Sequence, residues 1–302
     1  MSEPLRARAV AEWPTLALLA ACYGGWMIGT TWAAALWPPF GIALTALWVA
    51  LHSSLCHEAL HGHPFEDDRL NEALVFPALA LLIPYRRFRD THLAHHHDEH
   101  LTDPYDDPES NYFDPAVWAR LPGWIRRVLS FNNTLAGRLL VGPLVGQVVF
   151  MRDDWRAIRA GEPGVLSAWL WHVPAVALVI WWIAGIAAMP VWAYLIAVYA
   201  GLSILKIRTF LEHRAHEKAR GRTVIIEDRG VLALIFLNNN LHVVHHMHPK
   251  VPWYRLPALY AAHKAHYLGR NDGYRYRSYG EIFRKHFLRA KDPVPHPLWP
   301  EG

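Results

Sequence analysis

The chain has 302 residues, of which 53% are hydrophobic, yet its mean hydropathy is only +0.06. The formal net charge of +4 is too small and too diffuse to indicate nucleic-acid binding, so we expect no nucleic-acid partner. Two cysteines, Cys22 and Cys56, exclude a disulfide framework and a cysteine-ligated zinc or iron–sulfur site. Residues 14–56 and 165–205 contain no Asp, Glu, Lys or Arg, whereas the remainder is densely charged. This division is typical of a membrane protein with a large polar cap.

The N-terminal part predicts a hairpin of two membrane-spanning helices. Residues 14–34 and 40–60 are apolar stretches of about 20 residues, the length that spans hydrocarbon, and Trp37-Pro38-Pro39 separates them. Because Arg6 and Arg8 precede the first helix and the linker is uncharged, the positive-inside rule places the N-terminus in the cytoplasm. The second helix then returns to the cytoplasmic side, and His52, deep within it, is expected to pack rather than to bind a ligand.

The region that follows is predicted to stay on the cytoplasmic side. Residues 70–85 are apolar but only about 16 long and contain two prolines, so we expect them not to cross. A crossing would also separate the histidines that precede this segment from those that follow it. A basic run (86–90) and a Pro-containing acidic loop (98–114) come next. We expect an amphipathic interfacial helix at 118–128 and a second non-crossing apolar segment at 134–151.

Residues 165–184 and 190–207 predict a second hairpin, with an uncharged outer loop. His172 lies alone in its first helix and is expected to be structural. The chain then re-enters the cytoplasm, where the Pro-rich tail, 290–302, is expected to be loosely held. The fold prediction is an all-α integral membrane domain, residues 1–302, with four transmembrane helices in two hairpins. A cytoplasmic helical cap, formed by 61–164 and 208–302, is expected to hold a di-metal site. We expect the bacterial inner membrane, with both termini and the metal site cytoplasmic.

Three histidine clusters carry the chemistry: His57 and His61; His92, His95 and His96; and His242, His245 and His246. Histidines three or four residues apart lie on one face of a helix, close enough to share a metal ion. The eight imidazoles exceed what one zinc ion uses, and neutral imidazole also suits iron, copper and nickel. The alternative is that they are core or solvated side chains in a chain with 20 histidines. Three such clusters, each beside an apolar stretch, favour a dinuclear metal site, with iron as the first choice.

The ordered clusters around two apolar hairpins resemble the integral-membrane fatty acid desaturase and hydroxylase superfamily over roughly residues 40–265. Leu101-Thr102-Asp103-Pro104, Asp107-Pro108-Glu109, Asn238-Asn239-Asn240-Leu241 and 249–257 are similar to bacterial members, which include carotenoid ketolases. The resemblance implies a di-iron centre that uses O2 as co-substrate and whose ligands are the eight clustered histidines. It also implies a ligand after the fourth helix, for which His213 is chosen and His216 is the alternative. The first cluster has three intervening residues where acyl-CoA delta-9 desaturases have four, which argues against that subgroup.

Residues that could hydrogen-bond to the imidazole rings and orient them are less distinct in the sequence. Glu58, Asp90, Asp98 and Glu212 lie near the clusters and are of the residue type that orients ligand rings. For each of these carboxylates taken alone, we favour the interpretation that it is a solvated or ion-paired surface charge. Asn238 and Asn240 are candidates for holding a water molecule or a histidine ring, or for capping a helix.

The resemblance implies a lipidic substrate, with desaturation of a fatty acyl chain slightly favoured. The alternative is a hydroxylase, ketolase or other monooxygenase of a lipid, terpenoid or hydrocarbon. Trp48, Phe76 and Trp182 are candidate tunnel residues, although packing is the favoured role of each. The chain lacks flavin, nicotinamide and haem-attachment motifs, so a separate electron donor is expected, such as ferredoxin with its reductase. A non-enzymatic membrane metal or haem protein is a remote alternative, because a transporter needs more polar groups within the spans.

Overall fold

The computed structural model of the chain describes residues 11–96 and 99–299. Most elements are helices, and two short strands pair in parallel, Ile225 with Arg275 and Ile226 with Tyr276. The elements are α1 (Trp13–Ile28), η1 (Gly29–Ala33), α2 (Ala34–Leu36), α3 (Pro38–Leu60), α4 (Asp68–Leu74), α5 (Tyr85–His95), α6 (Pro115–Arg120), α7 (Gly123–Asn132), α8 (Leu135–Leu140), α9 (Gly142–Ala160), α10 (Val165–Gly185), α11 (Val191–Thr209), η2 (Ala219–Gly221), β1 (Ile225–Ile226), α12 (Val231–Ile235), α13 (His242–Met247), α14 (Leu256–Ala262), α15 (Lys264–Arg270), β2 (Arg275–Tyr276) and α16 (Tyr279–His286).

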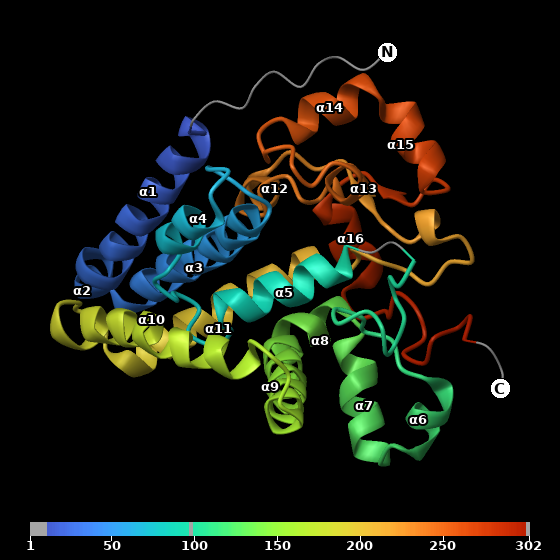
Figure 1. Cartoon of the computed structure of the whole chain (residues 1–302), viewed down its shortest axis with the longest axis horizontal. Helices are drawn as coiled ribbons and strands as arrows, with labels where there is room; N and C mark the ends of the chain where they lie inside the picture. The colour runs from blue at the N-terminus through green and yellow to red at the C-terminus, as the bar shows by residue number, and fades with distance from the viewer. Residues whose placement is uncertain (1–10, 97–98, 300–302) are drawn as a thin grey trace.

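Four helices are long and apolar enough to cross a membrane: Trp13–Leu36, Pro38–Leu60, Val165–Gly185 and Val191–Thr209. They confirm the prediction of two hairpins (Figure 1). Proline marks where the second and fourth begin: Pro38 is the first residue of α3, where its missing amide proton costs nothing, and Pro190 directly precedes α11 in extended backbone. Both hairpin turns carry exposed tryptophans, Trp32 and Trp37 at one and Trp181 and Trp192 at the other. Exposed aromatic rings at helix ends are typical of a membrane interface.

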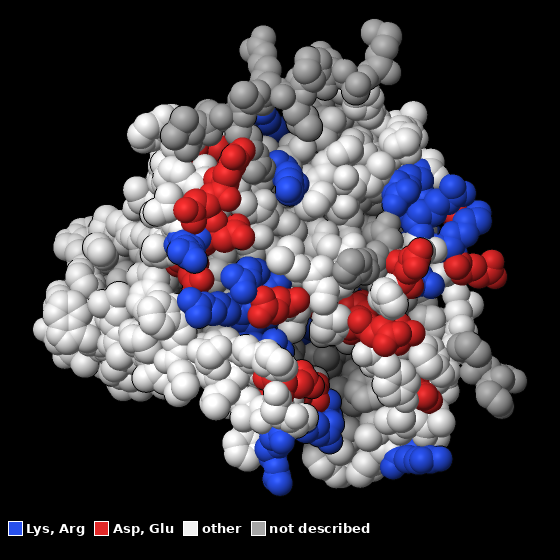
Figure 2. All heavy atoms as spheres, in the orientation of Figure 1, with Lys and Arg blue, Asp and Glu red and all other residues white. Residues whose placement is uncertain are grey.

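The charged side chains are distributed as a membrane requires. Figure 2 shows Lys, Arg, Asp and Glu gathered over the cap. The lobe that contains the turn ends of the long helices in Figure 1 shows none. The cytoplasmic orientation of the cap and the single-domain boundary stay predictions.

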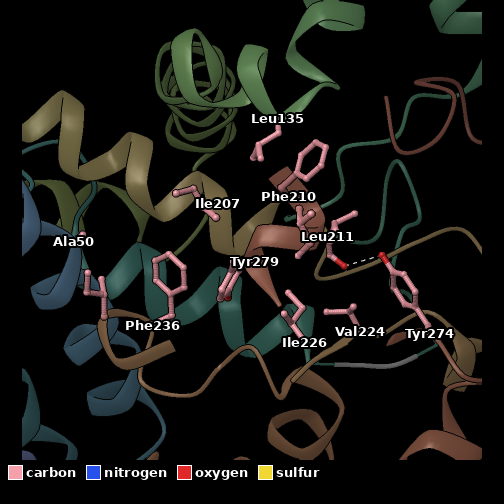
Figure 3. Packing of buried hydrophobic residues seen from close by; sticks show 12 residues of the cluster. Ala50, Leu135, Ile207, Phe210, Leu211, Val224, Ile226, Phe236, Tyr274 and Tyr279 are labelled. Carbon is pink, nitrogen blue, oxygen red and sulfur yellow. Dashed lines mark hydrogen bonds between the residues drawn. The ribbon is translucent and has the colours of Figure 1, made fainter. Parts of the chain in front are cut away.

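The two hairpins join through α3 and α11. A Cβ on Gly201 of α11 would lie 2.8 Å from the carbonyl oxygen of Ala46 on α3, so glycine permits this close approach. Just after the end of α11, Phe210 and Leu211 belong to the same buried cluster as Phe236 of the cap (Figure 3). The Tyr274 hydroxyl donates a 2.8 Å hydrogen bond to the carbonyl oxygen of Leu211. The end of α11 is therefore anchored in the cap, which fixes the segment that carries His213.

Residues 75–84, predicted not to cross, form no long helix and instead run between the hairpins. The Tyr194 hydroxyl donates to the Leu79 carbonyl oxygen at 2.7 Å. The His172 ring bonds the Leu81 carbonyl oxygen at 2.8 Å. These two side chains provide hydrogen-bond partners for backbone carbonyl oxygens that lie outside regular structure and among apolar helices. His172 has the structural role expected of it.

Two predicted segments of the cap differ in their bounds. The single helix expected at 118–128 is wrong: α6 ends at Arg120 and α7 begins at Gly123, because Pro122 disfavours helical backbone in the residue before it. The segment expected at 134–151 is divided into α8 and α9, and α9 continues to Ala160. Gly161 ends it with a φ of 74°, the left-handed conformation favoured at helix ends.

The prediction of a loosely held tail is wrong for residues 291–296. The Phe113 amide donates to the Val294 carbonyl oxygen at 3.0 Å. In return, the His296 amide donates to the Phe113 carbonyl oxygen at 2.8 Å, and Phe113 and Pro295 form a parallel bridge. Backbone pairing with the acidic loop holds this segment despite its prolines; residues 300–302 lie outside the described part of the chain.

Candidate metal centre

All nine predicted ligand residues meet at the junction of the membrane helices and the cap. They form two groups, within each of which one side-chain nitrogen per residue lies within 4.8 Å of all the others. The first group is His57, His61, His92, His96 and His245, and the second group is His95, His213, His242 and His246. The end of α3, α5, α13 and the segment after α11 supply them. His52 and His216 lie outside both groups.

Helical geometry explains how the clusters divide between the groups. Residues four apart lie almost above one another on a helix, so His57 and His61 enter the same group. His92 and His96 likewise share the first group, while His95 points to the second. On α13 the arrangement is reversed, since the second group takes the pair at 242 and 246 and the first takes the residue at 245. The first group thus combines two such pairs with one single residue, and the second group combines one pair with two single residues.

The distances between ring nitrogens fit a shared metal ion in each group. Nε2 of His92 lies 3.0 Å from Nε2 of His96, and Nε2 of His213 lies 2.9 Å from that of His95 and 3.1 Å from that of His242. Two nitrogens bound to one ion at about 2.1 Å and at right angles to each other lie about 3.0 Å apart.

Buried ring nitrogens without partners support the same fit. Within the part of the chain that the structure describes, the buried Nε2 atoms of His57 and His61 have no hydrogen-bond partner. Because unpaired buried polar atoms are costly, nitrogens converging in this way fit a bound cation. An all-imidazole donor set suits first-row transition metals rather than calcium or magnesium.

Oxygen atoms of the cap fix the far side of three rings. Nδ1 of His95 donates to Asp107 Oδ1 at 2.7 Å, and Nδ1 of His92 donates to Glu109 Oε1 at 2.9 Å. Nδ1 of His242 lies 3.0 Å from Asn239 Oδ1. With the proton held on Nδ1, the Nε2 lone pair is directed at the site, the arrangement typical of metal-bound histidine.

Sequence reasoning did not identify Asp107, Glu109 and Asn239 as partners of the rings. The first two belong to the acidic loop, whose distance along the chain from α5 carries no periodic signal. Only the folded loop brings its carboxylates beneath the second cluster. Asn239 lies three residues before His242, a spacing from which a direct bond could have been considered.

The protonation behaviour of the site follows from burial and charge. Burial, together with neighbouring imidazoles, lowers the pKa of His61, His213 and His242 well below its usual value. Burial alone would also lower the pKa of His95, but the carboxylates of Glu109 and Asp107 outweigh it and raise that pKa to about 9. Most of these rings are therefore neutral, the form that binds metal.

Two carboxylates expected on the surface are buried, so that expectation is wrong for them. Glu58 accepts a 3.1 Å hydrogen bond from the Trp253 amide and thereby joins the end of α3 to the loop after α13. Glu212 lies 3.1 Å from Arg208 Nε and 3.9 Å from Nδ1 of His242. Glu212 is adjacent to His213 in sequence, and its ion pair with Arg208 explains why a charged residue is tolerated there.

The other candidates that the structure describes make contacts away from the two groups. Asp90 pairs with Arg89 on the surface, as predicted, and Asp98 lies outside the described residues. Asn238 and Asn240 do not hold a ring: their amide groups donate to backbone carbonyl oxygens, at 3.1 Å to Trp253 and 2.6 Å to Ile226.

The candidate tunnel residues take part in packing. Trp48 and Trp182 pack against the cluster around Val179 and Tyr194, and the Phe76 ring lies 5.7 Å from that of Trp171. His52 packs nearby, with Nε2 3.1 Å from the Tyr23 hydroxyl, as expected of a residue without a ligand role.

Comparison with known proteins agrees with this geometry. The chain is 26% identical over 225 residues to a β-carotene ketolase of Paracoccus sp. (strain N81106 / MBIC 01143). This match covers 72% of the chain and 76% of the relative. The family model described as fatty acid desaturase matches residues 30–279, which include all nine histidines of the two groups. Together with the four apolar helices, these similarities indicate a membrane protein and support an oxidoreductase. The chain therefore belongs to the fatty acid desaturase family.

Proposed function

We propose that the protein is an oxygen-dependent di-iron oxidase that attacks an unactivated C–H bond of a lipidic substrate. The observation that carries this proposal is the convergence of nine imidazoles into two groups at the end of the membrane helices. The family and the ketolase relative support an oxidoreductase. Two adjacent ions, rather than one, suit the reduction of O2, which requires several electrons at a single site.

The first group would hold one ion and the second group the other. When bound, the iron pair would supply the activation of O2 and the removal of hydrogen from carbon. The chain's own contribution is placement: Asp107, Glu109 and Asn239 hold Nδ1 protons, so that the opposite nitrogens of their rings face the site. The contact between His95 and Asp107 is buried on both sides, which strengthens it electrostatically.

The position of the site favours a substrate that dissolves in the bilayer. His57 lies at the end of α3, a helix long and apolar enough to span the membrane. An apolar chain entering from the membrane would reach the site without crossing the charged cap. Desaturation and oxygen insertion share the first hydrogen abstraction, and the placement of the substrate decides between them. Acyl-chain desaturation is one outcome, and the similarity to β-carotene ketolase favours a second, oxygen insertion into an isoprenoid hydrocarbon.

Electrons would come from a separate donor, such as ferredoxin with its reductase. The sequence contains no flavin, nicotinamide or haem-attachment motif. An acidic donor protein would be attracted to a chain with a formal net charge of +4. We also propose that the cap lies on the cytoplasmic side of a bacterial inner membrane.

The first test is the metal content of the detergent-purified protein. We expect about two iron ions per chain, one for each nitrogen group. His61→Ala should lose iron and activity, whereas His216→Ala, which alters a histidine outside both groups, should retain them. Zinc at one ion per chain, or a haem spectrum, would contradict the proposal. Incubation with O2, reduced ferredoxin and either acyl lipids or carotenes then distinguishes a new double bond from an added oxygen by product mass.

A further inference from the structure

We propose that the C-terminal strap, residues 291–296, holds His213 in the second group and that Lys291 is the positioning residue within it. This inference rests on the proposed function, because it assigns a role to residues around the second metal position. The strap lies beyond residue 279, where the family match ends. The shared features of the family therefore do not account for it.

His213 is the member of the two groups that most needs support from outside its own element. The other eight lie on helices α3, α5 and α13 or directly at the end of one, whereas His213 follows the end of α11 at Thr209. Its Nδ1 lies 3.4 Å from the Thr223 hydroxyl, a longer contact than those that His92 and His95 make with carboxylates. A bridge between His213 and Thr223 fixes the backbone from one side only.

Lys291 supplies the contact on the other side. Its Nζ donates a 2.5 Å hydrogen bond to the backbone carbonyl oxygen of His213. A small polar pocket lies at this point, lined among others by Asp107, Glu109, Glu212 and both partners of this bond. A charged donor on a carbonyl oxygen forms a stronger bond than a neutral one, so Lys291 restrains the ligand's backbone in a segment without regular structure.

A second contact ties the strap to the residues that follow His213. The Tyr112 hydroxyl donates to a carboxylate oxygen of Asp292 and accepts a 2.9 Å hydrogen bond from the Ala215 amide. The Asp292 carbonyl oxygen accepts from the Asn133 side chain at 2.5 Å, which anchors the strap to the end of α7. The His213–Ala215 segment is therefore held at two points, by Lys291 directly and by Asp292 through Tyr112.

The strap also supports the other side of the second group. The Nε2 of His296 lies 3.3 Å from the Thr102 hydroxyl, and the Thr102 amide donates to Asp107 Oδ2 at 2.9 Å. Asp107 in turn holds Nδ1 of His95. One continuous segment thus reaches two ligands of the second group by independent routes, which a purely peripheral tail would not do.

The test compares Lys291→Met with a matched control, Lys285→Met. Lys285 is an exposed lysine on α16 that pairs with Glu281, so its loss alters charge without touching the strap. We expect Lys291→Met to release one of two bound irons to a chelator about tenfold faster or more, because removing a partner that supports a ligand typically weakens metal binding about 10–100-fold. Lys291→Arg, which keeps the charged donor, should restore slow release. Lys285→Met should behave as wild type.

Hydrogen exchange of the metal-free protein provides a readout that does not depend on iron. Lys291→Met should accelerate exchange of the Arg214 and Ala215 amides, and Lys285→Met should not. Unchanged exchange and unchanged iron release in Lys291→Met would overturn the role of the strap. If Lys291→Met fails to fold, Tyr112→Phe decides by the same measurements, because it removes only the hydroxyl that joins Asp292 to Ala215. Wild-type protein without iron would refute the proposed function and leave the exchange comparison to judge the strap.

Discussion

The hydrogen bond between Asp107 and His95 offers a sharp test of the second group. Asp107 is 5% exposed and accepts three hydrogen bonds: from His95 Nδ1 at 2.7 Å, from the Thr102 amide at 2.9 Å and from the Glu109 amide at 2.9 Å. Asp107→Asn preserves the size of the side chain but replaces one oxygen with an NH2 group. If the remaining oxygen takes the place of Oδ1, the ring and the Glu109 amide keep their acceptor. The NH2 group then faces the Thr102 amide, donor against donor.

The size of the effect follows from these contacts. Hydrogen bonds to charged groups contribute about 1.5–3 kcal/mol, whereas neutral ones contribute about 0.5–1.5 kcal/mol. The ring of His95 would thus lose about 1–1.5 kcal/mol of support, and the donor clash at Thr102 adds to this loss. Removing an outer partner of a metal-bound histidine typically weakens metal binding about 10–100-fold, or about 1.4–2.8 kcal/mol. The two estimates are of similar size, so we expect metal binding to weaken by this amount at the second group alone.

A competition titration measures this directly. The metal-free protein is titrated with ferrous iron against a chelator of known affinity, and the two binding steps are fitted separately. Asp106→Asn is the matched control, because this neighbouring carboxylate is exposed and lies 3.6 Å from the His100 ring. If neither binding step of the Asp107 variant is weaker than the matching step of the Asp106 variant, the claim that the buried carboxylate supports the ion of the second group is refuted.

Three further predictions concern the ligands and the topology. His61→Ala should lower the iron content by about one ion per chain while His52→Ala leaves it unchanged, because only the first belongs to a nitrogen group; elemental analysis decides. The pKa of His95 is raised to about 9, and only the neutral ring binds metal. The affinity of the second group for its ion should therefore rise with pH and level off above about pH 9, and metal titrations at a series of pH values measure this. A flat profile from pH 6 to 9 would contradict this ionisation. A reporter enzyme fused after Gly302 should be active in the cytoplasm, and periplasmic activity would overturn the topology.

The membrane part of the fold was predictable because its signals are local. Charge-free stretches of spanning length give helices at almost the predicted bounds, and the prolines at 38 and 190 mark where two of them begin. The histidine clusters were equally readable, since spacings of three and four residues on a helix determine which rings face one another. His213 required the family resemblance, because one histidine after a helix carries no pattern.

The cap was less predictable because its contacts join residues far apart in sequence. Nothing in the tail indicates that Val294 pairs with Phe113, and its prolines argue for loose structure. The buried position of Glu212 was likewise hidden, since its partner Arg208 belongs to a basic run that reads as a membrane boundary. Sequence therefore indicated which histidines converge, and the folded loops were needed to show which side chains hold their rings.

Charge balance explains why carboxylates surround the site without belonging to its nitrogen groups. Neutral imidazoles would leave the positive charge of two bound divalent ions uncompensated, and a buried net charge is costly. Asp107, Glu109 and Glu212 lie next to the histidine rings, where they would offset that charge. Burial raises the pKa of Glu212 while Arg208 opposes the rise, so bound cations would favour its ionised form further. On this reasoning the acidic loop and the strap that holds it would supply charge balance and position, while the histidines supply the nitrogens that face the site.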